Sequence, residues 1–441
     1  MHVSPLEVVA ELILLLSIIL IAAKIGGEIS ERYLKIPPVL GELVAGILIS
    51  PFLLGGIHWF GGGAVFELPP GGTQGLPVEP QLFFVAQVAA VILLFEAGLE
   101  TDRQQFMKYV RPATAVAAGG VVLPFAMGFG ATIMLGFASL ESIQAMLPAL
   151  FVGSIMTATS VGITARVLAD IRRLDSPEGV TVLAGAVIDD VLGIIILAVV
   201  VGIAEEGSVT AGSVGLVFLK AVGFWLGLMI IGSLVSGYIS RALLWFKSAG
   251  GALVLALALA FVAAGVAEIY FGLAMIIGAY TMGLALSGTE LKHQIEVSMR
   301  AVNNFMVPIF FVVIGMQVDF TAFGASEDTT LAASIIFAVV LSVFAVISKV
   351  VGAGVPALFV GFNRRGATRI ALGMLPRGEV ALIIAGIGLA SGVIGQDVFG
   401  VAIVMTIFTT ILAPIFLIPA FRGGSGLRSE AEDEVEADRG G

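Results

Sequence analysis

Two adjacent carboxylates in the middle of a long apolar segment constrain this chain more than any other feature. Asp189 and Asp190 lie eleven and twelve residues after Glu178, in an apolar run that ends before Glu205. A run of this length spans a bilayer, so both acids are predicted to lie near its midplane. An ionisable group at that depth costs at least about 2–3 kcal/mol and is usually functional. The pair therefore predicts a cation or proton site inside a membrane.

Composition excludes the main alternative, in which the pair belongs to a buried helix of a soluble protein. Hydrophobic residues make up 58% of the chain and charged residues only 12%, and the mean hydropathy is +1.08. We therefore expect one polytopic membrane domain over residues 1–421, in contact with membrane lipid. The absence of cysteine rules out disulfides, thiolate metal sites and sulfur nucleophiles. Nothing in the sequence predicts a nucleic-acid ligand, a cofactor or an enzyme.

Apolar runs bounded by charges, glycine and proline predict an all-α protein with thirteen membrane spans. The spans lie near residues 6–26, 37–55, 81–99, 112–135, 146–170, 178–203, 212–238, 250–267, 270–288, 299–318, 331–361, 366–391 and 397–421. Of the 22 Lys and Arg residues, 19 fall in every second connection between these spans. By the positive-inside rule the N-terminus lies outside and the C-terminus is cytoplasmic, which requires an odd number of spans.

A weak internal repeat relates the second span to the ninth. LGELVAGILIS (40–50) and IGAYTMGLALS (277–287) share two glycines five residues apart, followed by an apolar run that ends in serine. The copies are seven spans apart, so they enter the membrane from opposite sides. An inverted-topology repeat of this kind is typical of secondary transporters.

The fifth and twelfth spans, which are counterparts in this repeat, are both predicted to be interrupted. TATSVGITARVL (157–168) carries hydroxyl side chains and a glycine that can replace helical backbone bonds. MLPRGEVALIIAGIGL (374–389) contains Pro376, which cannot donate the helical hydrogen bond to Leu372. Two broken helices that face each other leave helix termini with partial charges inside the membrane, and charged groups must compensate these partial charges. Arg377 and Glu379 flank the second break, and we interpret them as a structural ion pair rather than as direct ligands of the ion.

The two central acids are predicted to have different tasks. Neighbouring helix residues point about 100° apart, so both cannot face one cavity. Lys349 is the one lysine near the midplane, and we expect it to pair with one Asp and leave the other freer. Burial favours protonation of the freer acid, so a proton and a small cation compete for its oxygens. Na⁺ suits carboxylate, hydroxyl and carbonyl oxygens, which Asp190, Thr159 and Ser160 supply together.

These residues resemble the second branch of the monovalent cation:proton antiporter superfamily, and within it the NapA-type bacterial Na⁺/H⁺ antiporters. The likeness covers the chain to about Phe421. It is carried, in this order, by PPVLGELVAGIL, TATSVGITARVL, GAVIDDVLG, PIFFVVIGMQVDF, the lysine of SKVVG and LPRGEVALII. The resemblance implies Na⁺(Li⁺)/H⁺ antiport in a prokaryotic plasma membrane.

The resemblance also implies roles for individual residues. It assigns ion binding and proton acceptance mainly to Asp190, with supporting oxygens from Thr159 and Ser160. It assigns the lysine-paired acid to Asp189 and its partner to Lys349. An Asp-Asp pair with this lysine is the family's electrogenic pattern. The resemblance also makes Glu379, together with Arg377, the residues that stabilise the crossing of the two broken helices.

The architecture implied by the resemblance is a homodimer that works by an elevator mechanism. Its core ion-translocation domain would comprise residues 81–203 and 299–391, and its dimerisation domain residues 1–56 and 212–288. Residues 422–441 are predicted to be a disordered acidic cytoplasmic tail. Potassium-linked relatives often carry a nucleotide-binding regulatory domain, and we expect none here.

Four other functions stay open at this point. The first is a K⁺/H⁺ antiporter with the same fold. The sequence indicates which kinds of ligand atom bind the ion, but it says less about the size of the cavity that distinguishes Na⁺ from K⁺. A Na⁺-coupled symporter of organic solutes would leave Lys349 without a task. An intramembrane aspartyl protease would need its two acids on separate helices, and a passive cation channel would show no obligatory exchange.

Overall fold

A computed structural model of the chain describes residues 4–34, 38–57, 64–68, 78–206, 211–246, 250–317 and 330–428. In these ranges the chain is mainly helical, and an isolated β bridge joins Phe362 and Leu427. Ten helical segments are long and apolar enough to cross a membrane. The helices are α1 Pro5–Ile29, a π turn Ser30–Leu34, α2 Pro38–Leu48, a 3₁₀ turn Leu54–Gly56, α3 Pro80–Glu100, α4 Arg103–Met134, α5 Ile143–Thr157, α6 Val161–Asp170, α7 Pro177–Glu206, α8 Ala211–Trp245, α9 Gly251–Phe271, α10 Met275–Leu286, α11 Leu291–Met316, α12 Leu331–Phe359, α13 Arg364–Gly373, α14 Glu379–Ala390 and α15 Gln396–Ala420.

The all-α polytopic fold is confirmed, and each predicted span contains a helix or a broken pair of helices. The number of membrane crossings stays a prediction, because α2 and α10 are only 11 and 12 residues long. The eighth and ninth spans separate later than predicted. Gly272 adopts the left-handed conformation, with φ +66°, and ends α9 four residues beyond Glu268. Glycine favours this position because it has no Cβ.

The structure contains both predicted helix breaks. Residues 158–160 separate α5 from α6, and residues 374–378 separate α13 from α14. At the first break the Ser160 side chain caps α6 by accepting a hydrogen bond from the Ile163 amide at 3.4 Å. At the second break Pro376 has no amide hydrogen to continue α13. The local sequence thus ends both helices inside otherwise apolar segments.

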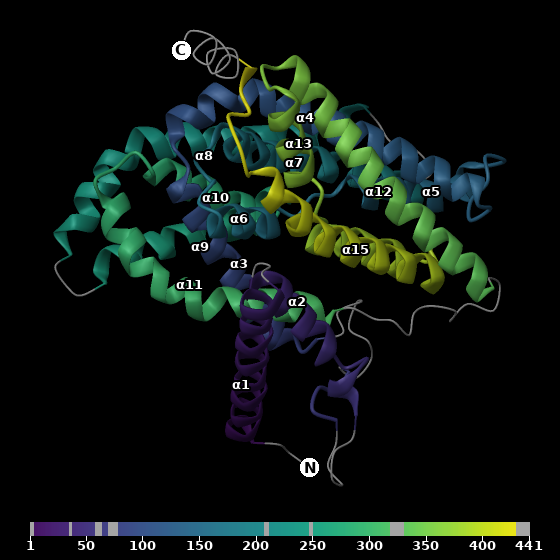
Figure 1. The fold of residues 1–441 in the computed structure, drawn as a ribbon, viewed down its shortest axis with the longest axis horizontal. Helices are drawn as coiled ribbons and strands as arrows, with labels where there is room; N and C mark the ends of the chain where they lie inside the picture. Colours follow the sequence, from purple (N-terminus) through teal and green to yellow (C-terminus); the bar gives the residue numbers. More distant parts are fainter. Residues whose placement is uncertain are drawn as a thin grey trace.

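The helices form two groups (Figure 1). In the core group, α4, α5, α7 and α12–α15 pack on one another. In the scaffold group, α1–α3 pack with α8–α11. Helix α6 continues from the core group and also touches α2 and α3, so it lies at the boundary.

The helix packing differs from the domain boundaries expected from sequence, and the division into an ion-translocation domain and a dimerisation domain stays a prediction. We placed residues 81–99 and 299–318 in the core domain, but α3 and α11 pack with the scaffold group. We ended the core domain at residue 391, but α15 packs on α12, α13 and α14 of the core group. The order of the helices along the chain does not determine which helices pack together, so the sequence could not give this grouping.

The glycines of the internal repeat make equivalent contacts in the two halves. Gly41 of α2 lies against the backbone of α1, and Gly278 of α10 lies against the backbone of α9. Gly46 lies against the backbone of α11, and Gly283 lies against the backbone of α3. Small residues allow this close approach between membrane helices. The opposite orientation of the two copies in the membrane stays a prediction.

We expect Gly283→Ala to destabilise the protein. The added Cβ would meet the backbone of Phe95 and Leu99 on α3, which cannot move aside as a side chain can. Overpacking of this kind costs about 1–3 kcal/mol. In the matched control, Gly130→Ala on α4, the new Cβ meets nothing within 4 Å, so we expect a neutral or slightly stabilising effect. Thermal unfolding of the detergent-solubilised variants measures both, and equal effects would contradict the close packing.

The start of the segment predicted to be a disordered tail is ordered. Residues 422–428 lie in the described structure and are tied to α13 and the turn before it. The side-chain amide of Asn363 donates to the carbonyls of Ser425 and Leu427 at 2.9 and 3.1 Å. Arg369 donates to the carbonyl of Gly424 at 2.9 Å. The prediction of disorder for residues 422–428 was therefore wrong, because their backbone carbonyls accept hydrogen bonds from the side chains of Asn363 and Arg369. Residues 429–441 lie outside the described residues.

Candidate functional site

The two acids lie in the middle of α7, as the thirteenth and fourteenth residues of this 30-residue helix. Asp189 is 1% exposed and Asp190 is 3% exposed. The helix positions them opposite the two breaks, because α7 packs on α5, α6 and α13. The charges predicted at the membrane midplane are therefore held inside the protein.

The two breaks meet directly beside these acids. The Ser160 amide donates to the Pro376 carbonyl at 2.7 Å, so the first break hydrogen-bonds to the second. The hydroxyl of Thr164 donates to the carbonyl of Gly373, the last residue of α13, at 2.7 Å. Gly378 lies against the Ser160 side chain, where a larger residue would not fit. These contacts replace helical bonds that the breaks remove.

Lys349 of α12 contacts Asp189 directly. Its ammonium is fully buried and donates to Asp189 Oδ2 at 2.9 Å, to Thr159 Oγ1 at 2.7 Å and to the Thr157 carbonyl at 2.7 Å. The Thr159 hydroxyl in turn donates to the same Asp189 oxygen. All three ammonium hydrogens therefore have acceptors, which a buried charge requires.

Asp190 is placed differently from its neighbour. One residue along a helix corresponds to a rotation of about 100°, and the contacts of Lys349 are made to Asp189. The charge of Asp190 nevertheless acts on the Lys349 ammonium. The two hydroxyls that we assigned to ion binding both have partners here. The Thr159 hydroxyl donates to Asp189 and accepts from Lys349, and the Ser160 side chain caps α6.

Arg377 lies at the second break and is fully buried. Its guanidinium donates to the carbonyls of Met156 at 2.9 Å, Ala345 at 3.3 Å and Leu375 at 3.4 Å. Met156 belongs to the last turn of α5, where Lys349 also binds the Thr157 carbonyl. Two cations thus compensate the negative end of α5.

The predicted partner of Arg377 was Glu379, and its side chain lies outside the described residues. The sequence argument missed the carbonyls of Met156 and Ala345, which lie 221 and 32 residues away along the chain. The available signal was the general rule that a helix C-terminus attracts cations. Thr410 was also missed, and its hydroxyl donates to the Arg377 carbonyl.

Four charged side chains of the described structure lie at the crossing. Asp189 interacts electrostatically with Lys349 and Arg377, and Lys349 interacts with Asp190. A proton and a monovalent cation each bring one positive charge to carboxylate oxygens beside these two bases. The binding of one therefore weakens the binding of the other.

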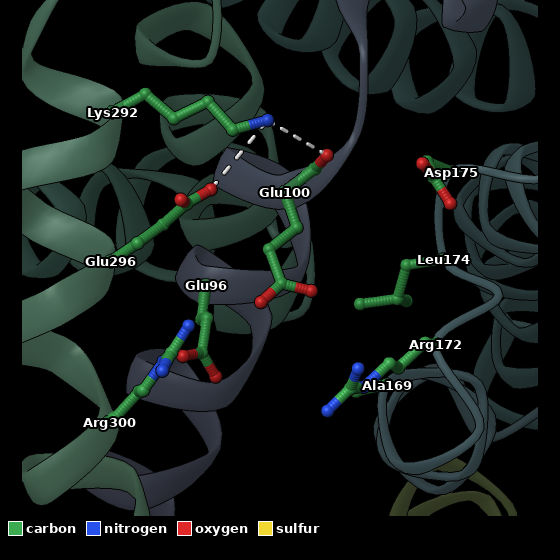
Figure 2. Close-up of a pocket in the computed structure, with 9 residues that line it drawn as sticks. All are labelled: Glu96, Glu100, Ala169, Arg172, Leu174, Asp175, Lys292, Glu296 and Arg300. Atoms are coloured by element: carbon green, nitrogen blue, oxygen red, sulfur yellow. Dashed lines mark hydrogen bonds and ion pairs between the residues drawn. The ribbon is translucent and has the colours of Figure 1, made fainter.

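A charged cavity of about 640 Å³ lies between the scaffold group and the far end of α6 (Figure 2). Lys292 reaches from α11 to the Glu100 carbonyl at 3.2 Å and to Glu296 at 3.7 Å. Helix α6 rises about 15 Å from the crossing to this cavity. The sequence argument did not single out these acids, although Glu96 and Glu100 end an apolar span on one helix face. The cavity is lined by Glu96, Glu100, Ala169, Arg172, Leu174, Asp175, Lys292, Glu296 and Arg300.

Known proteins with similar sequences are cation antiporters. The family described as sodium/hydrogen exchanger, transmembrane, matches residues 13–423. The high-affinity Na⁺/H⁺ antiporter NhaS3 of Synechocystis is 36% identical over 96% of this chain and 92% of its own length. The Na⁺/H⁺-K⁺ antiporter GerN of Bacillus cereus is 34% identical over 91% of this chain and 94% of its own length.

A solved structure has a similar fold. The sodium proton antiporter MjNhaP1 from Methanocaldococcus jannaschii superposes with a TM-score of 0.66, over 93% of this chain and 99% of that one. The two sequences are only 16% identical, so this similarity concerns the fold alone.

Proposed function

Because the chain belongs to the sodium/hydrogen exchanger family, we propose that it exchanges Na⁺ or Li⁺ for protons across a membrane. The resemblance to monovalent cation:proton antiporters is thus confirmed at the level of the family. The observation that carries the proposal is the pair of buried acids on α7 beside two crossing helix breaks. A proton and a monovalent cation would compete there for the same carboxylate oxygens.

In this mechanism Asp190 alternately holds a proton and Na⁺. Before Na⁺ binds, Asp189 is paired with Lys349, whose ammonium it contacts at 2.9 Å. Carbonyl oxygens of the two breaks and the hydroxyls of Thr159 and Ser160 would complete the coordination of Na⁺ after a local rearrangement, since both hydroxyls have other partners in this structure. Oxygen ligands of this kind suit a hard cation.

We propose that the exchange is electrogenic. Asp190 supplies one proton site, and Lys349 beside Asp189 is a second group that could release a proton when Na⁺ binds. Two protons exchanged for one Na⁺ move one net charge per cycle. The membrane potential contributes about 2.3 kcal/mol per charge per 100 mV, so it would help to drive Na⁺ export.

The division into two helix groups supports an elevator mechanism. The core group carries the acids and both breaks, so it would move as a unit against the scaffold group. We propose that the scaffold group forms a homodimer in a prokaryotic plasma membrane. The C-terminus would be cytoplasmic, and the charged cavity would be the cytoplasmic route to the site.

A K⁺/H⁺ antiporter is the second candidate, because the name of the relative GerN includes K⁺. Purified protein in proteoliposomes, with a pH-sensitive dye inside, separates the two. We expect Na⁺ and Li⁺ to dissipate an imposed pH gradient at concentrations at which K⁺ has little effect. Empty liposomes give the background leak. A response to K⁺ alone would overturn the proposed substrate.

A further inference from the structure

The segment that follows α15 forms a clasp on the core group. This clasp, residues 421–428, runs from the end of α15 past α13 (Figure 1). Its backbone pairs with the turn before α13, where the Asn363 amide donates to the Gly426 carbonyl at 3.0 Å. The Arg428 amide donates to the Gly361 carbonyl at 3.1 Å. Since the Asn363 side chain donates to two further clasp carbonyls, hydrogen bonds hold the clasp to α13 at several points.

A buried arginine joins the clasp to the helix that carries the two acids. Arg369 of α13 is 4% exposed. Its guanidinium donates at 2.6 Å to Oε1 of Glu178, which lies in the first turn of α7. The same guanidinium donates to the carbonyls of Gly423 and Gly424 at 3.2 and 2.9 Å. Gly426 lies so close to the Glu178 carboxylate that a Cβ would not fit. The contacts of Arg369 therefore tie α13, α7 and the clasp together.

The two helices joined in this way meet again at the exchange site. Helix α13 ends at Gly373, and the carbonyl oxygen of the next residue, Met374, lies 3.4 Å from the Thr159 hydroxyl. Helix α7 carries the two acids about three turns after Glu178. A ten-residue helix such as α13 is about 15 Å long and is held by its own hydrogen bonds. A shift of its outer end is therefore passed on to the carbonyls at its inner end.

We propose that Asn363 and Arg369 are positioning residues, which through the clasp hold α13 where its terminal carbonyls can bind Na⁺. The inference rests on the proposed exchange function, in which carbonyl oxygens of the two breaks complete the coordination of the ion. An ion site loses affinity when a ligand is displaced by about 1 Å. The clasp thus sets the Na⁺ affinity from the outer end of α13.

Asn363→Asp releases the clasp selectively. Asn363 Oδ1 accepts hydrogen bonds from two amides in the first turn of α13, and aspartate keeps an oxygen for this cap. The new carboxylate has no amide hydrogens for the two clasp carbonyls, so it would repel them. Arg369→Gln is the second variant, and it removes the ionic contact with Glu178 together with the donors to the clasp.

The pH-dye assay in proteoliposomes, titrated with Na⁺, measures both variants. We expect each to raise the Na⁺ concentration for half-maximal exchange about three- to tenfold, which is less than the loss typical of residues directly behind a metal ligand. The maximal rate should change less than about twofold, since the acids themselves are intact. Because both substitutions act through one segment, their combination should raise the half-maximal concentration no further than the larger single effect.

Two controls separate this role from a general loss of stability. Thr368→Ala removes an exposed hydroxyl of α13 that donates to a carbonyl of its own helix, and a chain that ends at Arg428 keeps the whole clasp. Both should leave the half-maximal concentration unchanged. If Arg369→Gln fails to fold because Glu178 is left unpaired, Asn363→Asp still decides the question, since it keeps the buried ion pair.

Three results would overturn the proposal. These are an unchanged half-maximal concentration in Asn363→Asp, even where its thermal stability falls, effects of the two substitutions that multiply, and an equal shift in either control. Failure of the antiport function itself would show separately, as wild-type protein without ion-driven proton movement.

Discussion

Asp190→Asn is expected to abolish Na⁺-driven proton movement while leaving the protein folded. Asparagine has nearly the same size as aspartate, but it neither accepts a proton in this range nor offers a negative charge to a cation. Removing one buried charge relieves a desolvation penalty, and it also removes an attraction on the Lys349 ammonium. The two effects oppose each other, so the stability of the variant should stay close to that of the wild type. We expect exchange to fall by at least about a hundredfold, since every cycle passes through this carboxylate.

The pH-dye assay in proteoliposomes measures this loss. Asp190→Glu is the matched control, because it keeps a titratable carboxylate on a side chain that is one methylene longer. We expect it to retain slow exchange with weakened Na⁺ affinity. Retained Na⁺-driven proton movement in Asp190→Asn would refute the assignment of Asp190.

Lys349→Gln is expected to have the largest effect on stability. The substitution leaves Asp189, which is 1% exposed, without its cationic partner. It also removes a donor from the Thr157 carbonyl at the end of α5. Removing one member of a buried ion pair costs about 3–5 kcal/mol, because the other charge stays buried. Exchange should persist through Asp190, with a changed pH dependence and fewer charges moved per cycle.

A second substitution tests the cause of this instability. Asp189→Asn added to Lys349→Gln removes both charges, so we expect most of the lost stability to return. Thermal unfolding in detergent compares the wild type, the two single variants and the double variant. If the double variant is no more stable than Lys349→Gln alone, the stranded charge of Asp189 is not the cause. A voltage-sensitive dye in proteoliposomes measures the charge moved per cycle.

The two predictions concern different halves of the acid pair, and the structure explains why they differ. Asp189 is held by Lys349 and Thr159, so it contributes to the architecture of the crossing. The assignment of the ion to Asp190 stays a prediction, supported by the separation of the two side chains around α7. The crossing also depends on Arg377, whose removal would expose the carbonyl end of α5 to an apolar interior.

The sequence was sufficient to predict those features whose cause lies within a short segment of the chain. Long apolar runs defined the helices, since a segment of that length and hydropathy is stable in a bilayer only when its backbone bonds are satisfied internally. Pro376 and the hydroxyl-rich stretch around Ser160 located both breaks, since they remove or replace bonds within a single turn. The acids at 189 and 190 identified the site because charge is rare at that depth.

Tertiary structure alone decided everything that depends on residues far apart in the chain. It placed α3, α11 and α15 in groups that the order of the chain did not indicate, and it tied residues 422–428 to Asn363 and Arg369. It also brought Arg377 to the α5 carbonyls. These contacts follow from which helix faces pack together. That outcome is a property of the whole assembled bundle, whereas helix formation and breakage are properties of each segment.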